Sequence, residues 1–240
     1  MITPVETAVA AADTEALLQR DPALVQGGDL ASFPPAKMIT DLSICANRYG
    51  PPPSALDALR RLVDERPGDL IPPPYQAEEL YLQAFADHLG TEAELMLPGG
   101  GVTEFFSILA RIWHRDRVAV VTPDNSGTVD LFSYATFLAP PNPARDTVEA
   151  RLSRVHHALK NHDAVLLSNP SNPLGHYIPR EALVEAARQR PQSLLVIDEE
   201  CVAFQGGEGV SYVGADADNI VILQSSGKAY GLVGVRAGVL

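Results

Sequence analysis

The sequence has 240 residues, of which 46% are hydrophobic and 20% charged, and its net charge is −12. This length and composition favour one large globular domain and exclude a disordered chain. The acidic charge argues against binding to nucleic acid or to an anionic membrane surface, and no apolar run is long enough to span a bilayer. Cys45 and Cys201 form no metal-binding or redox spacing, so the sequence predicts no metal site and a reducing, cytoplasmic location.

Helical and strand patterns alternate from about residue 54 onward. In chain order, we expect helices at 54–65, 77–90 and 103–113, a strand at 117–121, helices at 128–138 and 148–160, a strand at 164–168, a helix at 180–189, and strands at 193–197, 220–224 and 235–240. The strand segments are short apolar runs without polar alternation, which is typical of strands buried on both faces. The pattern therefore predicts an α/β fold with a mainly parallel sheet flanked by helices.

Polar side chains follow four of the predicted strands at the point where each strand ends. Asn125 follows the first of these strands, Asn172 the second, Asp198 the third, and Ser225 and Lys228 the fourth. Ligands of open α/β sheets gather at the carboxyl ends of the strands. We therefore expect these residues to lie along one edge of the sheet.

Lys228 lies among small residues in the segment SSGKAYG, residues 225–231. Ile222 and Ala229 stand where a nucleotide P-loop has Gly and Ser or Thr, and GLVGVRAG (231–238) does not fit the dinucleotide pattern G-x-G-x-x-G. Two interpretations stay open: an amine nucleophile that forms a Schiff base, or a lysine that extends from a loop into solvent.

Three further features also have both a structural and a functional interpretation. Asp198 is either a strand-end cap or metal ligand, or a carboxylate that holds a pyridine ring nitrogen protonated. Asn172 either belongs to a plain turn, SNPSNPLG, or binds a ligand hydroxyl. The segment PGGGVTE, residues 98–104, is either a flexible turn or an anion site at a helix N-terminus, assisted by Thr103 and Arg236.

Taken together and in this order, these segments resemble the class I/II aminotransferase family of fold-type I pyridoxal-phosphate enzymes. PGGGVTE is similar to the family's phosphate loop, and SNPSNPLG to its Asn-Pro-x-Asn-Pro-x-Gly turn. VIDEECVAF resembles its Asp-Glu-Ala-Tyr strand end, and SSGKAYGLVGVRAG its Ser-x-Ser-Lys-x-x-x-x-x-Gly-x-Arg segment. The likeness begins near Gly27 and points to the subgroup of histidinol-phosphate aminotransferase and threonine-phosphate decarboxylase.

The resemblance implies a pyridoxal 5′-phosphate cofactor and an aminotransferase that acts on an amino acid or on a phosphorylated amino-acid derivative. Lys228 would form the Schiff base and carry protons, and Asp198 would pair with the pyridinium nitrogen. Asn47 and Gly50 are expected at the substrate, and the family implies a homodimer. Further cofactor-binding positions implied by the resemblance are Gly101, Val102, Thr103, Asn125, Asn172, Cys201, Ser225 and Arg236.

The sequence departs from the family in several places. Asn125 stands where the family usually has a stacked aromatic residue, Cys201 where it has tyrosine, and Gly227 where a serine precedes the lysine. Residues 1–50 would form an N-terminal arm and residues 51–240 the large cofactor-binding domain, with the family's small C-terminal domain missing from this chain. Two other functions stay open: decarboxylation of a phosphorylated amino acid or other α-carbon chemistry, and cofactor binding without turnover.

Overall fold

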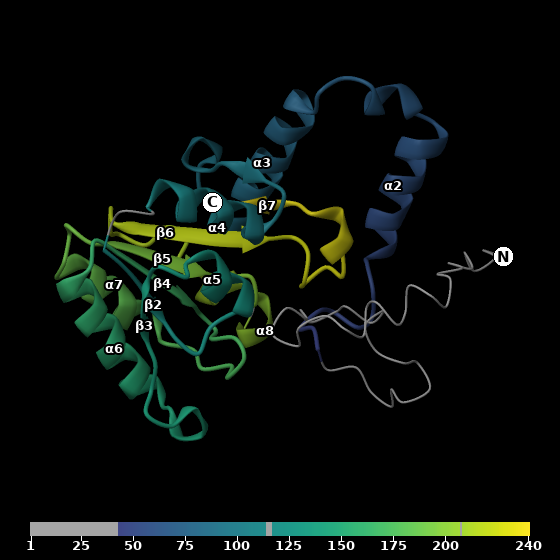
Figure 1. Cartoon of the computed structure of the whole chain (residues 1–240). Helices are drawn as coiled ribbons and strands as arrows, with labels where there is room; N and C mark the ends of the chain where they lie inside the picture. Colours follow the sequence, from purple (N-terminus) through teal and green to yellow (C-terminus); the bar gives the residue numbers. More distant parts are fainter. Residues whose placement is uncertain (1–42, 114–116, 207) are drawn as a thin grey trace, which may run out of the picture. The chain divides into compact units, whose positions relative to one another are not determined.

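The computed structural model describes residues 43–113, 117–206 and 208–240, and Ala46–Leu240 form one compact unit. Within the described residues a seven-stranded sheet has the order β1-β7-β6-β5-β4-β2-β3 (Figure 1). The predicted N-terminal arm falls mostly on residues 1–42, which lie outside the described residues. The strands are β1 Pro98–Gly99, β2 Val118–Val121, β3 Thr136–Leu138, β4 Ala164–Ser168, β5 Leu194–Asp198, β6 Ile220–Ser225 and β7 Gly238–Val239.

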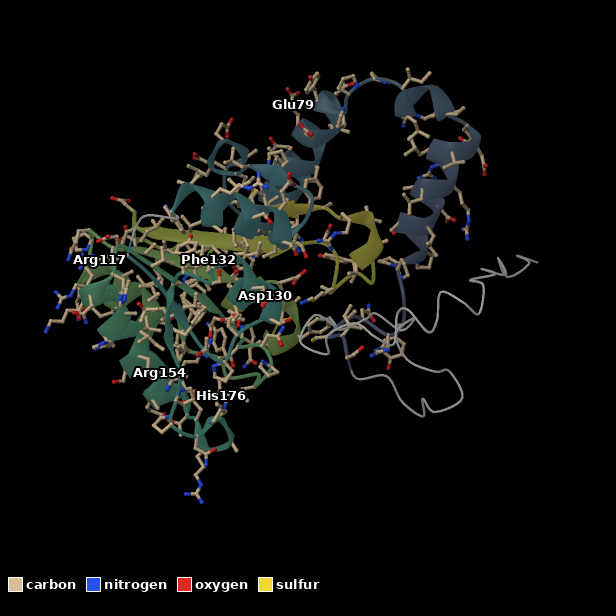
Figure 2. All side chains as sticks on the ribbon, viewed as in Figure 1. Glu79, Arg117, Asp130, Phe132, Arg154 and His176 are labelled. Atoms are coloured by element: carbon tan, nitrogen blue, oxygen red, sulfur yellow. The ribbon has the colours of Figure 1, made fainter. Side chains whose placement is uncertain are left out.

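Helices lie on both faces of the sheet. The helices of the described residues are α2 Pro53–Asp64, α3 Tyr75–Leu89, α4 Val102–Ile112, α5 Ser126–Leu131, α6 Val148–Asn161, α7 Arg180–Arg188 and α8 Ala203–Gly206. One core cluster joins α4 and the end of α5 to the sheet, and a second joins α6 and α7 to its other face (Figure 1). Phe132, which follows α5, packs edge-on against Phe106 of α4 in the first layer, whereas Arg154 of α6 belongs to the second (Figure 2).

The central strands confirm the predicted parallel sheet. Every residue of β2 and β4 is buried, and in β5 only the first residue is partly exposed. β3, β2, β4, β5 and β6 pair in parallel. α5 connects β2 to β3, α6 connects β3 to β4 and α7 connects β4 to β5, as parallel neighbours require a crossover connection. Among the residues that the structure describes, none of the helices has both the length and the apolar character that a bilayer crossing requires.

The helix predicted at 128–138 is wrong in its second half. α5 begins earlier, at Ser126, because the Asn125 side chain accepts a hydrogen bond from the Gly127 N–H and caps the helix. Residues Thr136–Leu138 instead form β3, which pairs in parallel with β2. A three-residue edge strand has too few positions to show alternation, and its pairing with β2 decides its conformation.

The strand predicted at 235–240 is also shorter than expected. Only Gly238–Val239 forms a strand, after a 3₁₀ turn at Val233–Val235. This strand, β7, pairs antiparallel with β6 on one side and with the unpredicted β1 on the other. Two-residue strands leave no periodic signal, so the mixed edge of the sheet could not be predicted from local sequence.

Candidate active site

The candidate site lies at the carboxyl ends of the parallel strands. Ser168, the last residue of β4, is paired with Asp198, the last residue of β5, and Asp198 with Leu223 of β6. α5 and α8 lie at this end of the sheet, together with the loops that follow β4, β5 and β6 (Figure 1). The register therefore confirms that the polar residues after these strands share one edge.

Lys228 is directed into the protein rather than into solvent. Its Nζ lies 2.7 Å from a carboxylate oxygen of Glu200 and 4.0 Å from the sulfur of Cys201, and the lysine side chain is 13% exposed. Burial lowers the pKa of the Lys228 amine, but the charge of Glu200 and the hydrogen bond to it, together with the nearby Cys201, raise it by more, so the pKa lies above its ordinary value. The amine is thus held as an ammonium ion in a largely enclosed place.

Glu200 connects this lysine to the neighbouring strand. Its second carboxylate oxygen accepts a hydrogen bond of 3.2 Å from the Ser225 hydroxyl, and its side chain is 14% exposed. No role was expected for Glu200, although the Asp-Glu-Ala-Tyr pattern has alanine at this position. The preceding Glu199 takes part in a separate buried network, in which it accepts hydrogen bonds from Ser211 and Gln224.

Asp198 is buried at the end of β5. It accepts a hydrogen bond of 2.9 Å from the Glu200 N–H. Burial raises the pKa of Asp198 to about 7, and the nearby charge of Glu200 adds to this rise. Among the described residues no group of three or more His, Cys, Asp or Glu side chains is arranged to hold a metal ion.

The segment at the N-terminus of α4 forms a cradle with Arg236. Gly101 precedes the helix with a φ of +89°, and a Cβ placed on it would lie 2.8 Å from the Arg236 guanidinium. Only glycine therefore suits this position. Val102 is buried and Thr103 exposed in the first helical turn, whose N–H groups have no carbonyl within the helix to pair with. The turn and the guanidinium together suit an anion.

This cradle is continuous with the lysine site. Gly238 of β7 is paired with Ser225, and a Cβ on Gly238 would lie 2.9 Å from the Cα of Gly101. Ser225 thus stands between the helix N-terminus and Glu200, to which it donates its hydrogen bond. The structure brings the predicted anion site, Ser225 and Lys228 together.

The segment that contains Asn47 and Gly50 lies against the lysine loop. The Asn47 N–H donates a 2.8 Å hydrogen bond to the Lys228 carbonyl, and a Cβ on Gly231 would lie 2.7 Å from the carbonyl carbon of Gly50. The Asn47 side chain accepts a hydrogen bond from the Tyr49 N–H. Both residues are therefore next to the site, while their contact with a substrate stays a prediction.

Asn125 and Asn172 are tied to the backbone around them. The Asn125 side chain caps α5, and the Asn172 N–H donates a 2.9 Å hydrogen bond to the Ser168 hydroxyl. That hydroxyl in turn donates to Asp124 over 3.0 Å. The structure therefore places Asn172 at the site edge through a network that begins at Asp124, for which no role was expected.

Asp124 and Arg151 form an ion pair in the interior. Their side chains are 1% and 0% exposed, with 3.5 Å between carboxylate oxygen and guanidinium nitrogen. Arg151 also donates to the carbonyls of Pro123 and Ser168. Burial raises the pKa of Asp124 and lowers that of Arg151, although each charge opposes the other's shift. The sequence signal for this ion pair is the position of Arg151, which lies on the buried face of the helix predicted at 148–160.

Comparison with known proteins identifies the family. The model of aminotransferase class I and II matches residues 37–240. Histidinol-phosphate aminotransferase 1 of Pseudomonas aeruginosa is 27% identical over 86% of this chain and 57% of its own length, and histidinol-phosphate aminotransferase 2 of Archaeoglobus fulgidus is 29% identical over 85% and 57%. The chain thus spans less than two thirds of the length of these relatives.

Solved structures agree with this result. The histidinol-phosphate aminotransferase of Sinorhizobium meliloti, solved in complex with pyridoxal-5′-phosphate, matches 81% of this chain and 54% of its own, with a TM-score of 0.66 and 26% identity. The L-threonine-O-3-phosphate decarboxylase of Porphyromonas gingivalis shares the fold, with a TM-score of 0.56 and 22% identity over 68% of this chain and 48% of its own. The chain therefore has the α/β fold of fold-type I pyridoxal-phosphate-dependent transferases and belongs to the aminotransferase class I and II family.

Proposed function

We propose that the protein is a pyridoxal-phosphate-dependent aminotransferase that acts on an amino acid or on a phosphorylated amino-acid derivative. The observation that carries this proposal is the buried amine of Lys228, which lies in one continuous site with the Asp198 carboxyl and the anion cradle at Gly101. The family and the two named histidinol-phosphate aminotransferases support amino-group transfer over the other functions considered.

The residues at the site fit three groups of the cofactor, namely its aldehyde, its ring nitrogen and its phosphate. Lys228 would hold its aldehyde carbon, Asp198 its ring nitrogen, and Gly101, Thr103 and Arg236 its phosphate. The glycine position supports this assignment, because a side chain there would displace the guanidinium from the helix N-terminus. Val102, Asn125, Asn172, Cys201 and Ser225 complete the proposed cofactor-binding set.

Bound in this way, the cofactor would supply an electron sink for negative charge at the substrate α-carbon. Asp198 would keep a proton on the ring nitrogen, since a cation beside the buried carboxyl favours its charged form and offsets the effect of burial. Lys228 Nζ would move protons at the reacting carbon, and Arg236 would balance the phosphate charge. Asn47 and Gly50, which lie beside the lysine loop, would line the substrate side.

Borohydride reduction of the protein incubated with pyridoxal phosphate should place a pyridoxyl group on Lys228. The sequence holds three lysines, Lys37, Lys160 and Lys228, so peptide mass spectrometry can assign the label without ambiguity. Lys160 is exposed on α6, so Lys160→Ala is the matched control and should leave the labelling unchanged. A label absent from Lys228, or equal on all three lysines, would contradict the cofactor site.

The same preparation tests the reaction. Incubation with a panel of amino acids, including phosphorylated ones, should yield the corresponding oxo acids and a new amino acid from an added 2-oxo acid. Release of carbon dioxide with retention of the amino group would assign the protein to the decarboxylases instead. Binding of the cofactor without any product would make it a binding protein.

We also propose a homodimer, with residues 1–50 as an arm and 51–240 as the large domain, in the cytoplasm. α2 contributes no buried residue, and apolar side chains stay exposed on and near α2 and α3, among them Ile71 at 85% and Leu80 at 66%. Such exposure is typical of surfaces that another protein covers. Cys45 and Cys201 are thiols rather than halves of a disulfide, which suits a reducing compartment.

Light scattering should therefore give twice the chain mass of 25.7 kDa. Replacing both Ile71 and Leu80 with Asp should shift the protein toward the monomer, because charged groups at an apolar interface must lose their hydration. A folded wild-type protein that stays monomeric at all concentrations would contradict the dimer.

A further inference from the structure

The Glu200 carboxylate is placed to control the Lys228 amine. One of its oxygens lies 2.7 Å from Nζ and the other accepts the Ser225 hydrogen bond, so both oxygens are occupied and the carboxylate cannot turn away without losing a contact. Both side chains of the ion pair are mostly buried, where opposite charges attract more strongly than in water. The pair therefore fixes where the amine lies and which form it takes.

The other charged or titratable groups around the lysine come from the same end of the sheet. Cys201 lies 4.0 Å from Nζ, and the buried Asp198 adds its field from β5. From α3 the Tyr81 hydroxyl reaches Ser226 over 3.5 Å, next to the lysine loop but not to Nζ. Glu200 is thus the group in direct salt-bridge contact with Nζ among the described residues.

We propose that Glu200 is a positioning residue that holds Lys228 as an ammonium ion and so sets the pH above which the amine combines with a carbonyl compound. The Asp-Glu-Ala-Tyr pattern that this segment resembles has alanine at this position. The inference rests on the proposed use of Lys228 as a nucleophile, but its test does not need the cofactor.

The chemistry follows from the lone pair on nitrogen. An ammonium ion has no free pair, so Nζ must first pass a proton to Glu200 or to water before it can attack a carbonyl carbon. The new carbon–nitrogen bond forms, and the carbonyl oxygen leaves as water after it has taken up protons. One ammonium ion and one aldehyde thus give one protonated imine and one water, and Glu200 begins and ends as a carboxylate.

The test is reductive methylation with formaldehyde and cyanoborohydride across a pH series, with the extent at each lysine read by mass spectrometry. Lys160 is the internal reference, because it is exposed on α6. In Glu200→Gln the midpoint of Lys228 methylation should fall by about one pH unit or more, the size of shift that a close opposite charge produces. Near neutral pH this corresponds to roughly a tenfold increase in Lys228 labelling.

Two further variants keep the test decisive. Glu200→Ala carries the residue that the family pattern has here, so it suits the fold even if the glutamine variant does not, and it should show the same shift. Glu185→Gln changes an exposed glutamate on α7 and should leave the midpoint unchanged. Equal Lys228 midpoints in the wild type and in a folded Glu200 variant would overturn the inference.

The outcome is separable from that of the proposed function. If the methylation midpoint shifts as expected but pyridoxal phosphate never labels Lys228, Glu200 controls the amine and the aminotransferase proposal fails. If pyridoxal phosphate labels Lys228 and the midpoint does not move, the cofactor site stands and Glu200 has no part in it.

Discussion

Replacing Asp198 with Asn should slow amino-group transfer by about a hundredfold or more, the usual effect of losing a group aimed at developing charge. The neutral amide cannot keep a proton on the cofactor's ring nitrogen, so negative charge at the α-carbon is no longer stabilised. Cofactor labelling of Lys228 should persist, because the amine and the phosphate cradle are unchanged. Steady-state rates measured with saturating cofactor test this, and equal rates in both proteins would remove Asp198 from the mechanism.

The same variant should be more stable than the wild type when the cofactor is absent and the pH is high. The pKa of Asp198 is about 7 in the folded protein against 3.8 for an ordinary Asp, so the folded state favours the protonated carboxyl. Ionisation therefore opposes folding: the penalty is absent below about pH 4 and complete above about pH 7, where it reaches about 4 kcal/mol at most. The amide of the Asp198→Asn variant resembles the protonated acid and avoids this penalty.

Thermal unfolding at pH 5 and pH 8 measures the difference. We expect the unfolding temperature of Asp198→Asn to exceed that of the wild type by about 5 °C or more at pH 8, and by much less at pH 5. Asp218→Asn makes the same chemical change at an exposed position and should shift neither value. A gain at pH 8 no larger than that at pH 5 would show that burial does not raise this pKa.

Replacing Asp124 with Ala should lower the free energy of unfolding by about 3–5 kcal/mol, because the Arg151 charge would remain buried without its counter-ion. The change also removes the acceptor of the Ser168 N–H and hydroxyl, and with it the support of the turn at Asn172. We therefore expect weaker cofactor binding as well as lower stability. Urea unfolding followed by circular dichroism gives the first quantity, and cofactor titration the second.

The chain offers a matched control for this prediction. Arg117 and Asp163 form an ion pair of 2.9 Å at the protein surface, with side chains 70% and 52% exposed (Figure 2 labels Arg117). Asp163→Ala should cost about 1 kcal/mol or less, because water screens and solvates both charges. In the double variant Asp124→Leu with Arg151→Met most of the loss should be recovered, since no buried charge remains. Equal losses in Asp124→Ala and Asp163→Ala would contradict the interior role of the pair.

The parallel core and the edge at which the site lies could both be predicted from the sequence. The runs at 117–121, 164–168 and 193–197 are apolar on both faces, so only a sheet covered on both sides can bury them. The polar residues that follow these runs must then meet at one edge, as Asp198 and Ser225 do. Lys228 could also be singled out from the sequence. A long charged side chain among such small residues is unusual, and small neighbours leave room for a ligand beside it.

Which charges meet depends on the packed structure and could not be predicted. Glu200 and Lys228 are 28 positions apart in the chain, and Asp124 and Arg151 are 27 apart, so no local periodicity links either pair. Hydrophobic patterns indicate whether a position is buried or exposed to water. An ion pair between distant residues forms only when the packing of their segments brings the two side chains together. The tertiary structure also determines the short strands β1, β3 and β7. Segments of two or three residues become strands because they pair with the strand beside them.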